Sequence, residues 1–167
     1  PPLEGGELET LRRQNEPLLA ATAPFLVQAR GFLAHTGTVM ILSDAQGTIL
    51  DVEGDAQLRD AIEKAGLVPG FNWREATMGT NAIGTALAAE QPVQVHASEH
   101  YREEVHKWTC SASVIRDPID RSVLGVLDLS GLRRDYSPQS LALISAVIDG
   151  VEARLVQMET LYRIQLL

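Results

Sequence analysis

The strongest periodic pattern in this sequence lies at its C-terminal end, in residues 137–167. Apolar side chains recur there alternately every three and four residues, at Leu141, Ile144, Ile148, Val151, Leu155, Met158 and Tyr162. This heptad spacing predicts a long helix with one apolar stripe, and Ser137 followed by Pro138 provides its N-cap and first turn. One helix on a small sheet rarely packs over more than about 20 residues. We therefore expect the stripe to cover the domain's own sheet up to about Val151 and to contact a second copy of the chain beyond it.

A similar spacing of apolar residues runs through residues 7–33. Pro17 and Pro24 interrupt it, and a proline inside a helix removes one backbone hydrogen bond and clashes with the preceding turn. We expect two helices, residues 3–16 and 17–35, with a possible kink near Pro24.

Runs rich in β-branched residues between the terminal helices predict five strands, at residues 38–44, 48–53, 92–96, 109–116 and 122–129. Short helices are predicted at residues 55–65, 80–90 and 99–107, the last of them capped by Ser98. This order of elements predicts an α+β fold, an α/β/α sandwich with a central antiparallel sheet of five to six strands. The short helices would cover one face and the N- and C-terminal helices the other, with a cavity between the sheet and the short helices.

The segment MGTNAIGTALAAE, residues 78–90, is a helix former with unusually small side chains. Thr80 is the predicted N-cap, and Asn81, Gly84, Thr85 and Ala88 fall on one stripe. Glycine in a helix interior costs about 1 kcal/mol relative to alanine, so Gly84 suggests the close approach of another backbone or of a ligand. The stripe fits a pocket wall and tight packing against the sheet equally well.

Histidine, cysteine and acidic residues are the candidates for chemistry. His96, His100 and His106 lie within eleven residues, but without an HExxH pair they are better read as solvated or capping side chains than as metal ligands. Cys110 has no base identifiable from the sequence, which favours a buried structural thiol. Ser111 follows Cys110 on a predicted strand, so the two side chains point to opposite faces of the sheet and either face could border a pocket. Asp128 lies on the neighbouring predicted strand, and as an inward-facing acid it needs a hydrogen bond that a ligand could supply.

Charge and composition exclude several classes of function. The net charge is −8, which argues against direct contact of this chain with a nucleic-acid backbone. No run approaches the roughly 18 consecutive apolar residues of a membrane span, and a single cysteine fits a reducing, cytoplasmic compartment. The chain opens at Pro1 without a methionine and stops inside an apolar helical run, so we expect a piece of a longer polypeptide.

Four separated motifs occur in the order GFNWREATMGTNAIGTALAAEQPVQV, EHY, WTCSASVIRDP and GVLDLSG. Together they resemble the GAF domain near the N-terminus of AcoR- and DhaR-type sigma-54-dependent transcriptional activators, the regulators of acetoin and dihydroxyacetone operons. The resemblance covers about residues 39–155. It implies a GAF sandwich that acts as a sensory module and controls an attached ATPase and helix-turn-helix segment, neither of which is in this chain.

This resemblance and the residue patterns together lead to one main hypothesis. The chain is a non-catalytic sensory domain that binds a small polar metabolite, such as acetoin, a diol or another carbonyl compound, and needs no metal or cofactor. Residues 1–36 and 137–167 would serve signalling and homodimerisation, and residues 37–136 would form the sensory core. The candidate ligand contacts are Asn81, Thr85, His100, Ser111 and Asp128, with Trp73, Trp108 and Cys110 as walls.

Two other functions remain open. The chain could be a protein-interaction module without a small ligand, which exposed Phe71 and Trp73 would favour. It could also be an enzyme, or a haem or redox sensor, that uses Cys110 and a histidine. No base, nucleophile and orienting group form a recognisable set, so we expect no enzymatic activity.

Overall fold

Five antiparallel strands form the central sheet, in the order β2-β1-β5-β4-β3. The structure, a computed structural model, describes residues 1–132 and 138–167. The strands are β1 (Thr38–Asp44), β2 (Ile49–Gly54), β3 (Val93–His96), β4 (Thr109–Arg116) and β5 (Val123–Gly131). The hairpins β1–β2 and β4–β5 join through the central pair β1–β5, and β3 lies at the edge beside β4. The five predicted strands are therefore all present, with ends within two residues of the expected ones.

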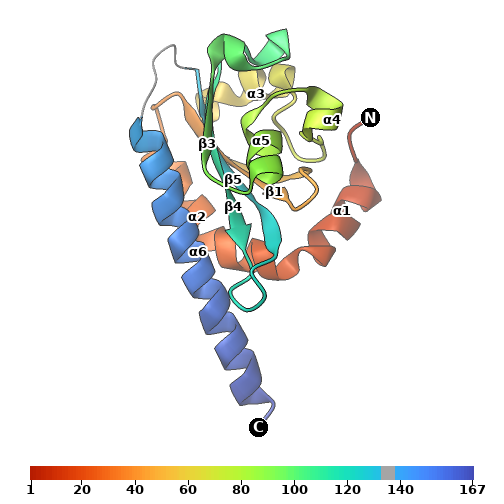
Figure 1. The fold of residues 1–167 in the computed structure, drawn as a ribbon, viewed down its shortest axis with the longest axis vertical. Helices are drawn as coiled ribbons and strands as arrows, with labels where there is room; N and C mark the ends of the chain where they lie inside the picture. The colour runs from red at the N-terminus through yellow and green to blue at the C-terminus, as the bar shows by residue number, and fades with distance from the viewer. Residues whose placement is uncertain (133–137) are drawn as a thin grey trace.

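Helices cover both faces of this sheet. They are α1 (Gly5–Gln14), α2 (Glu16–Phe32), α3 (Arg59–Ala65), α4 (Glu75–Met78), α5 (Ala82–Ala89) and α6 (Pro138–Gln165), with the short 3-10 helices η1 (Ala56–Leu58), η2 (Ala97–Glu99) and η3 (Glu103–Val105). Figure 1 shows α2 and α6 on one side of the sheet and α3, α4 and α5 on the other. The predicted α+β architecture, an α/β/α sandwich with its terminal helices on one face, is confirmed.

Because helices cover each face, the central strands β1, β4 and β5 are buried on both sides along most of their length, whereas the edge strands β2 and β3 are partly exposed. In β1, Val39 and Ile41 belong to the core beneath the short helices, whereas Met40 and Leu42 belong to the core beneath α2 and α6. Strands of this kind are apolar almost throughout instead of alternating between apolar and polar side chains. Most polar side chains on the central strands are consequently buried, namely Ser43, Asp44, Thr109, Ser111, Ser113, Asp128 and Ser130.

The apolar stripe of α6 packs on its own domain further than expected. Ile144, Ile148, Val151 and Leu155 are buried, and Met158 packs against the same core. Tyr162 is 60% exposed, and the C-terminal end of α6 projects beyond the body of the domain (Figure 1). The boundary expected near Val151 thus lies at least one turn later, while the predicted N-cap, Ser137, falls outside the described residues.

Two predictions about short helices are wrong. Asn81, and not Thr80, is the N-cap of α5, because the Asn81 Oδ1 accepts a hydrogen bond from the Gly84 N–H at 2.9 Å. The helix predicted for residues 99–107 is replaced by η2 and η3. There, the backbone N–H of His96 donates to the Glu99 carboxylate at 2.7 Å, and Ala97 adopts a positive φ of 45° that interrupts regular helix.

At Gly84 and Thr85, the small-residue stripe of α5 contacts the chain segment that leads into α4. A Cβ added to Gly84 would lie 2.7 Å from the Glu75 backbone nitrogen and 2.8 Å from the Trp73 carbonyl oxygen. The Thr85 hydroxyl donates to the Glu75 carboxylate at 2.6 Å. The stripe therefore packs against the segment that leads into α4, while Ala82, Ile83 and Ala86 are buried in the core over the sheet.

We expect Gly84→Ala to lower the free energy of unfolding by about 1–3 kcal/mol, because the added methyl group meets backbone atoms that cannot rotate away. Gly31→Ala is the matched control, since Gly31 is also helical and a Cβ there meets nothing within 4 Å. The control should gain up to about 1 kcal/mol from helix propensity. Urea unfolding followed by circular dichroism measures both changes, and equal effects would contradict the close approach at Gly84.

Candidate functional site

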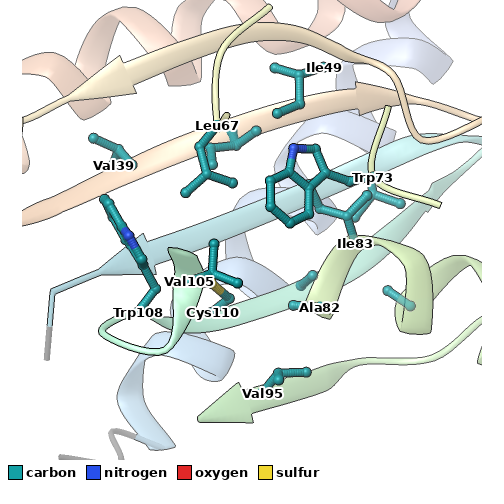
Figure 2. Close-up of a cluster of buried hydrophobic side chains, with 14 of the residues drawn as sticks. Val39, Ile49, Leu67, Trp73, Ala82, Ile83, Val95, Val105, Trp108 and Cys110 are labelled. Carbon is teal, nitrogen blue, oxygen red and sulfur yellow. The ribbon is translucent and has the colours of Figure 1, made fainter. Parts of the chain in front are cut away.

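A small cavity lies between α5, the η2–η3 segment and the sheet. Its volume is about 10 Å³, close to the minimum that one water molecule needs. Ten residues line it: Leu67, Trp73, Asn81, Ala82, Ile83, His100, Val105, Cys110, Asp128 and Ser130. Figure 2 shows the apolar side chains around this region, with Leu67 and Val105 drawn between the two tryptophans, Trp73 and Trp108.

Strand register brings three polar side chains together on the floor of the cavity. Cys110 on β4 pairs with Ser130 on β5, and Asp128 follows on the same face two residues earlier. The Ser130 hydroxyl lies 3.0 Å from the Cys110 sulfur and makes a short hydrogen bond to the Asp128 Oδ2. A serine has one proton to donate. When Asp128 is ionised, Ser130 donates to it and can accept from the Cys110 thiol, which forms a chain that ends at the carboxylate.

Asp128 is the one acid on the cavity floor, and half of its carboxyl group has no partner. The side chain is 1% exposed, and its Oδ1 makes no hydrogen bond within the described residues. Burial disfavours the charged form and raises the pKa of Asp128 to about 7, although the Ser130 hydrogen bond opposes this shift. Burial also raises the pKa of the Cys110 thiol well above its usual range, with the Asp128 charge acting in the same direction.

His100 belongs to the opposite wall, at the end of η2. It is 3% exposed, and its Nδ1 lies 2.8 Å from the Ala97 carbonyl oxygen. Burial lowers the pKa of His100. A neutral ring that donates from Nδ1 keeps Nε2 as an acceptor. The His106 ring donates to the His100 carbonyl oxygen at 3.0 Å, which ties η3 to the same segment.

Residues 7–153 match the family described as "MimR, N-terminal domain". The chain belongs to this family. Among its curated relatives is an uncharacterised 47.3 kDa protein from the thcA 5′ region of Rhodococcus erythropolis, which is 39% identical over 155 residues. A second is MimR of Mycolicibacterium goodii, the propane 2-monooxygenase operon transcriptional activator, which is 34% identical over 140 residues. A third is AcoR of Bacillus subtilis, the acetoin dehydrogenase operon transcriptional activator, which is 31% identical over 153 residues. The matches cover 92%, 83% and 92% of this chain, which spans only 35%, 24% and 25% of the respective relatives.

Solved structures show the same fold for this MimR N-terminal domain. DhaR(N), in its complex with DhaL from Escherichia coli, superposes with a TM-score of 0.89 at 20% identity, over 98% of this chain and 56% of that one. The cofactor-binding GAF domain of CodY from Clostridium difficile superposes with a TM-score of 0.54 at 14% identity, over 92% and 99%. The predicted GAF-like sandwich and the resemblance to AcoR- and DhaR-type activators are thereby confirmed.

Of the eight predicted contacts in this MimR-family domain, five line the cavity: Trp73, Asn81, His100, Cys110 and Asp128. Trp108 is buried in the same core but does not line the cavity. Thr85 faces Glu75, as described above. Ser111 lies on the other face of β4, where it accepts a hydrogen bond from the Gln94 amide at 2.7 Å.

Asn81 lines the cavity mainly as a structural residue. Its Nδ2 donates to the Trp73 and Gly79 carbonyl oxygens, each at 2.8 Å, while its Oδ1 caps α5. Both amide protons are therefore already used. Ser130 was not among the predicted contacts, although its spacing of two from Asp128 placed both side chains on one strand face.

Within residues 1–132 and 138–167 there is no group of three or more histidine, cysteine or acidic side chains that could hold a metal ion. No helix described there is long and apolar enough to cross a membrane.

We expect Asp128→Asn to change how stability depends on pH. Asp128 has a folded-state pKa of about 7, against about 3.9 in an unfolded chain. Between these values the folded state holds a proton that the unfolded state has lost, so wild-type stability falls by about 1.4 kcal/mol per pH unit from this group as pH rises from about 4 to 7. Above pH 7 the loss is complete. The stability of D128N relative to wild type should therefore rise over this window.

Urea unfolding at half-unit steps from pH 4.5 to pH 8 measures this difference, and comparison with wild type cancels the titration of the other groups. Asp120→Asn is the control, because its exposed carboxyl has a pKa lowered by hydrogen bonds from Ser122 and gains no proton on folding. If the unfolding free energies of wild type and D128N changed in parallel with pH, Asp128 would not be a buried, neutral acid.

Proposed function

We propose that this chain is the sensory domain of a transcriptional activator and that a small polar molecule binds between α5 and the sheet. The observation that carries the proposal is the buried Oδ1 of Asp128, which faces no donor in the described chain. A buried polar atom without a partner costs about 1–3 kcal/mol. A ligand that satisfies this atom would therefore stabilise the domain. MimR and AcoR, the operon activators, support the regulatory role, and the operon named for AcoR makes acetoin, diols and short carbonyl compounds the first candidates.

The route from the cavity to the terminal helices runs through β4. Cys110 faces the cavity, whereas Ile115 on the same strand is buried against α2 and α6. The Glu152 carboxylate of α6 accepts a hydrogen bond from the Arg116 backbone N–H at 2.9 Å, at the end of β4. Because the cavity volume of about 10 Å³ is close to the minimum for a single water molecule, a larger ligand must displace the cavity walls. A shift of β4 would then reach α6 directly.

The output of this response would lie in other parts of the whole protein. The curated relatives are about three to four times as long as the matched segment, so DNA contact and transcriptional control are assigned to regions outside it. We infer no enzymatic activity and a cytoplasmic location. Cys110, the one cysteine of the chain, is buried and has a raised pKa, which disfavours the reactive thiolate.

A thermal-shift screen of the purified domain tests the ligand. Acetoin, short diols, aldehydes and ketones are added at increasing concentration, and a binding compound should raise the melting temperature progressively. Ala82→Leu is the control variant, because the larger side chain at this 2% exposed position fills the cavity and should abolish the shift. If no compound raises the melting temperature of the wild-type domain, the small-molecule proposal is wrong.

We also propose homodimerisation through the terminal helices. Beyond Leu155, the exposed apolar side chains of α6 include Val156, Leu161, Tyr162 and Ile164. Leu161→Glu should weaken self-association at least tenfold by placing a charge in the contact, whereas Gln157→Glu, at an exposed polar position of the same helix, should not. Sedimentation equilibrium measures both, and a wild-type domain that stays monomeric at all concentrations would contradict the proposal.

Regulation by a partner protein is the second candidate function. Two observations favour it: the cavity is only about 10 Å³ in volume, and DhaR(N), which shares this fold, is found in a complex with DhaL. The loop aromatics do not add support, because Trp73 is 2% exposed and Phe71 packs against the core. The two candidates differ in the effect of Ala82→Leu on the full-length activator. Filling the cavity removes a response to a small ligand but leaves a response to a surface-bound partner intact.

A further inference from the structure

The side chains around the cavity use their hydrogen-bond donors within the protein. The Trp73 indole N–H donates to the Gly66 carbonyl oxygen at 2.8 Å. Both Asn81 amide protons go to backbone carbonyl oxygens, and so does the proton on Nδ1 of His100. None of these groups is left with a proton for a ligand.

On the floor of the cavity, the Ser130 hydroxyl also uses its proton within the protein when Asp128 is ionised. Ser130 donates its one proton to Oδ2 of Asp128, and the Cys110 thiol lies within reach of the Ser130 oxygen. The cavity-lining atom that makes no hydrogen bond within the described residues is then an acceptor, Oδ1 of Asp128. With Asp128 ionised, the side chains of this cavity thus present acceptors, and a ligand must bring the protons.

We propose that the cavity recognises a small alcohol or vicinal diol by accepting its O–H groups, chiefly at Asp128, and discriminates against analogues that carry only carbonyl groups. This inference rests on the proposed sensory function and narrows its ligand class. A hydroxyl group donates a proton, whereas a ketone oxygen can only accept one. A ketone placed against Asp128 would leave its Oδ1 unpartnered and bring two acceptors together.

Cavity size sets a second condition on the ligand. The present volume of about 10 Å³ accommodates one water molecule. Each additional carbon atom must displace an apolar wall formed by residues such as Leu67, Ile83 and Val105. The ligand therefore has few carbon atoms, and its apolar part contacts these side chains while its hydroxyl groups face Asp128.

Discrimination between hydroxyl and carbonyl compounds should be strong. A site that hydrogen-bonds a substrate hydroxyl rejects an analogue without it by much more than a site that only recognises shape, because the buried polar group is left unsatisfied. We expect at least a tenfold loss of affinity for each donating hydroxyl that is replaced by a carbonyl group.

Two near-isosteric pairs test this expectation on the purified domain: 2-propanol against acetone, and 2,3-butanediol against acetoin. Dissociation constants are measured at pH 8.5, where the carboxylate is ionised, by chemical-shift titration of the labelled protein. The hydroxyl member of each pair should bind at least tenfold more tightly. Asp128→Asn supplies an amide N–H that can donate, so D128N should reduce this preference at least tenfold or reverse it.

Ser111→Ala is the matched control. Ser111 lies on the other face of β4, so this substitution should leave the preference for hydroxyl compounds unchanged.

The comparison of the two pairs on the wild-type domain needs no variant and stands even if D128N does not fold. If acetone and acetoin bind as tightly as their hydroxyl partners, the hydroxyl inference is overturned while the sensory function stands. If none of the four compounds binds, while other compounds shift the melting temperature, the ligand class is wrong. If no compound binds in the titration and none shifts the melting temperature in the thermal-shift screen, both the hydroxyl inference and the proposed small-molecule sensing function are wrong.

Discussion

Burial of the sheet on both faces is the constraint on which the rest of this structure depends. With α2 and α6 on one side and α3 to α5 on the other, the central strands β1, β4 and β5 have almost no solvated face where a polar side chain could remain hydrated. Each polar residue on a central strand must then be hydrogen-bonded inside the protein. Ser111 meets this condition through Gln94, and Ser130 through Asp128. Asp128 meets it with only one oxygen. Oδ1 of Asp128 is therefore the atom on the cavity floor that a bound ligand could satisfy.

The strands and terminal helices could be predicted because their patterns are local. β-Branched runs bounded by turn residues located all five strands, and the heptad spacing located α6. The errors arose where distant contacts decide between local alternatives. Thr80 and Asn81 are both good N-caps, but only the Asn81 amide also satisfies the Trp73 carbonyl oxygen, eight residues away. Likewise the residues predicted as a helix after Ser98 are held as 3-10 turns, with the Ala97 N–H donating to the Trp108 carbonyl oxygen.

The candidate site was predictable in part for a related reason. Alternation along a strand separates Cys110 from Ser111, yet it does not say which face borders a cavity when both faces are buried. Trp73, His100 and Asp128, which line the cavity, were predicted as ligand contacts from their chemistry and from the family motifs. Apolar lining residues such as Leu67 and Val105 carry no such mark, because in sequence they are indistinguishable from the rest of the core.

The contact at Gly84 has a mechanical consequence for the cavity. With no side chain between them, the backbone of α5 rests directly on residues 73–75, and the Asn81 amide binds the same segment from below. One boundary of the cavity is therefore a rigid block of two segments joined through main-chain atoms. The opposite boundary, from Ala97 to Trp108, consists of single turns joined by a few hydrogen bonds. We therefore expect the turns from Ala97 to Trp108 to resist displacement less than α5 does when a ligand enlarges the cavity.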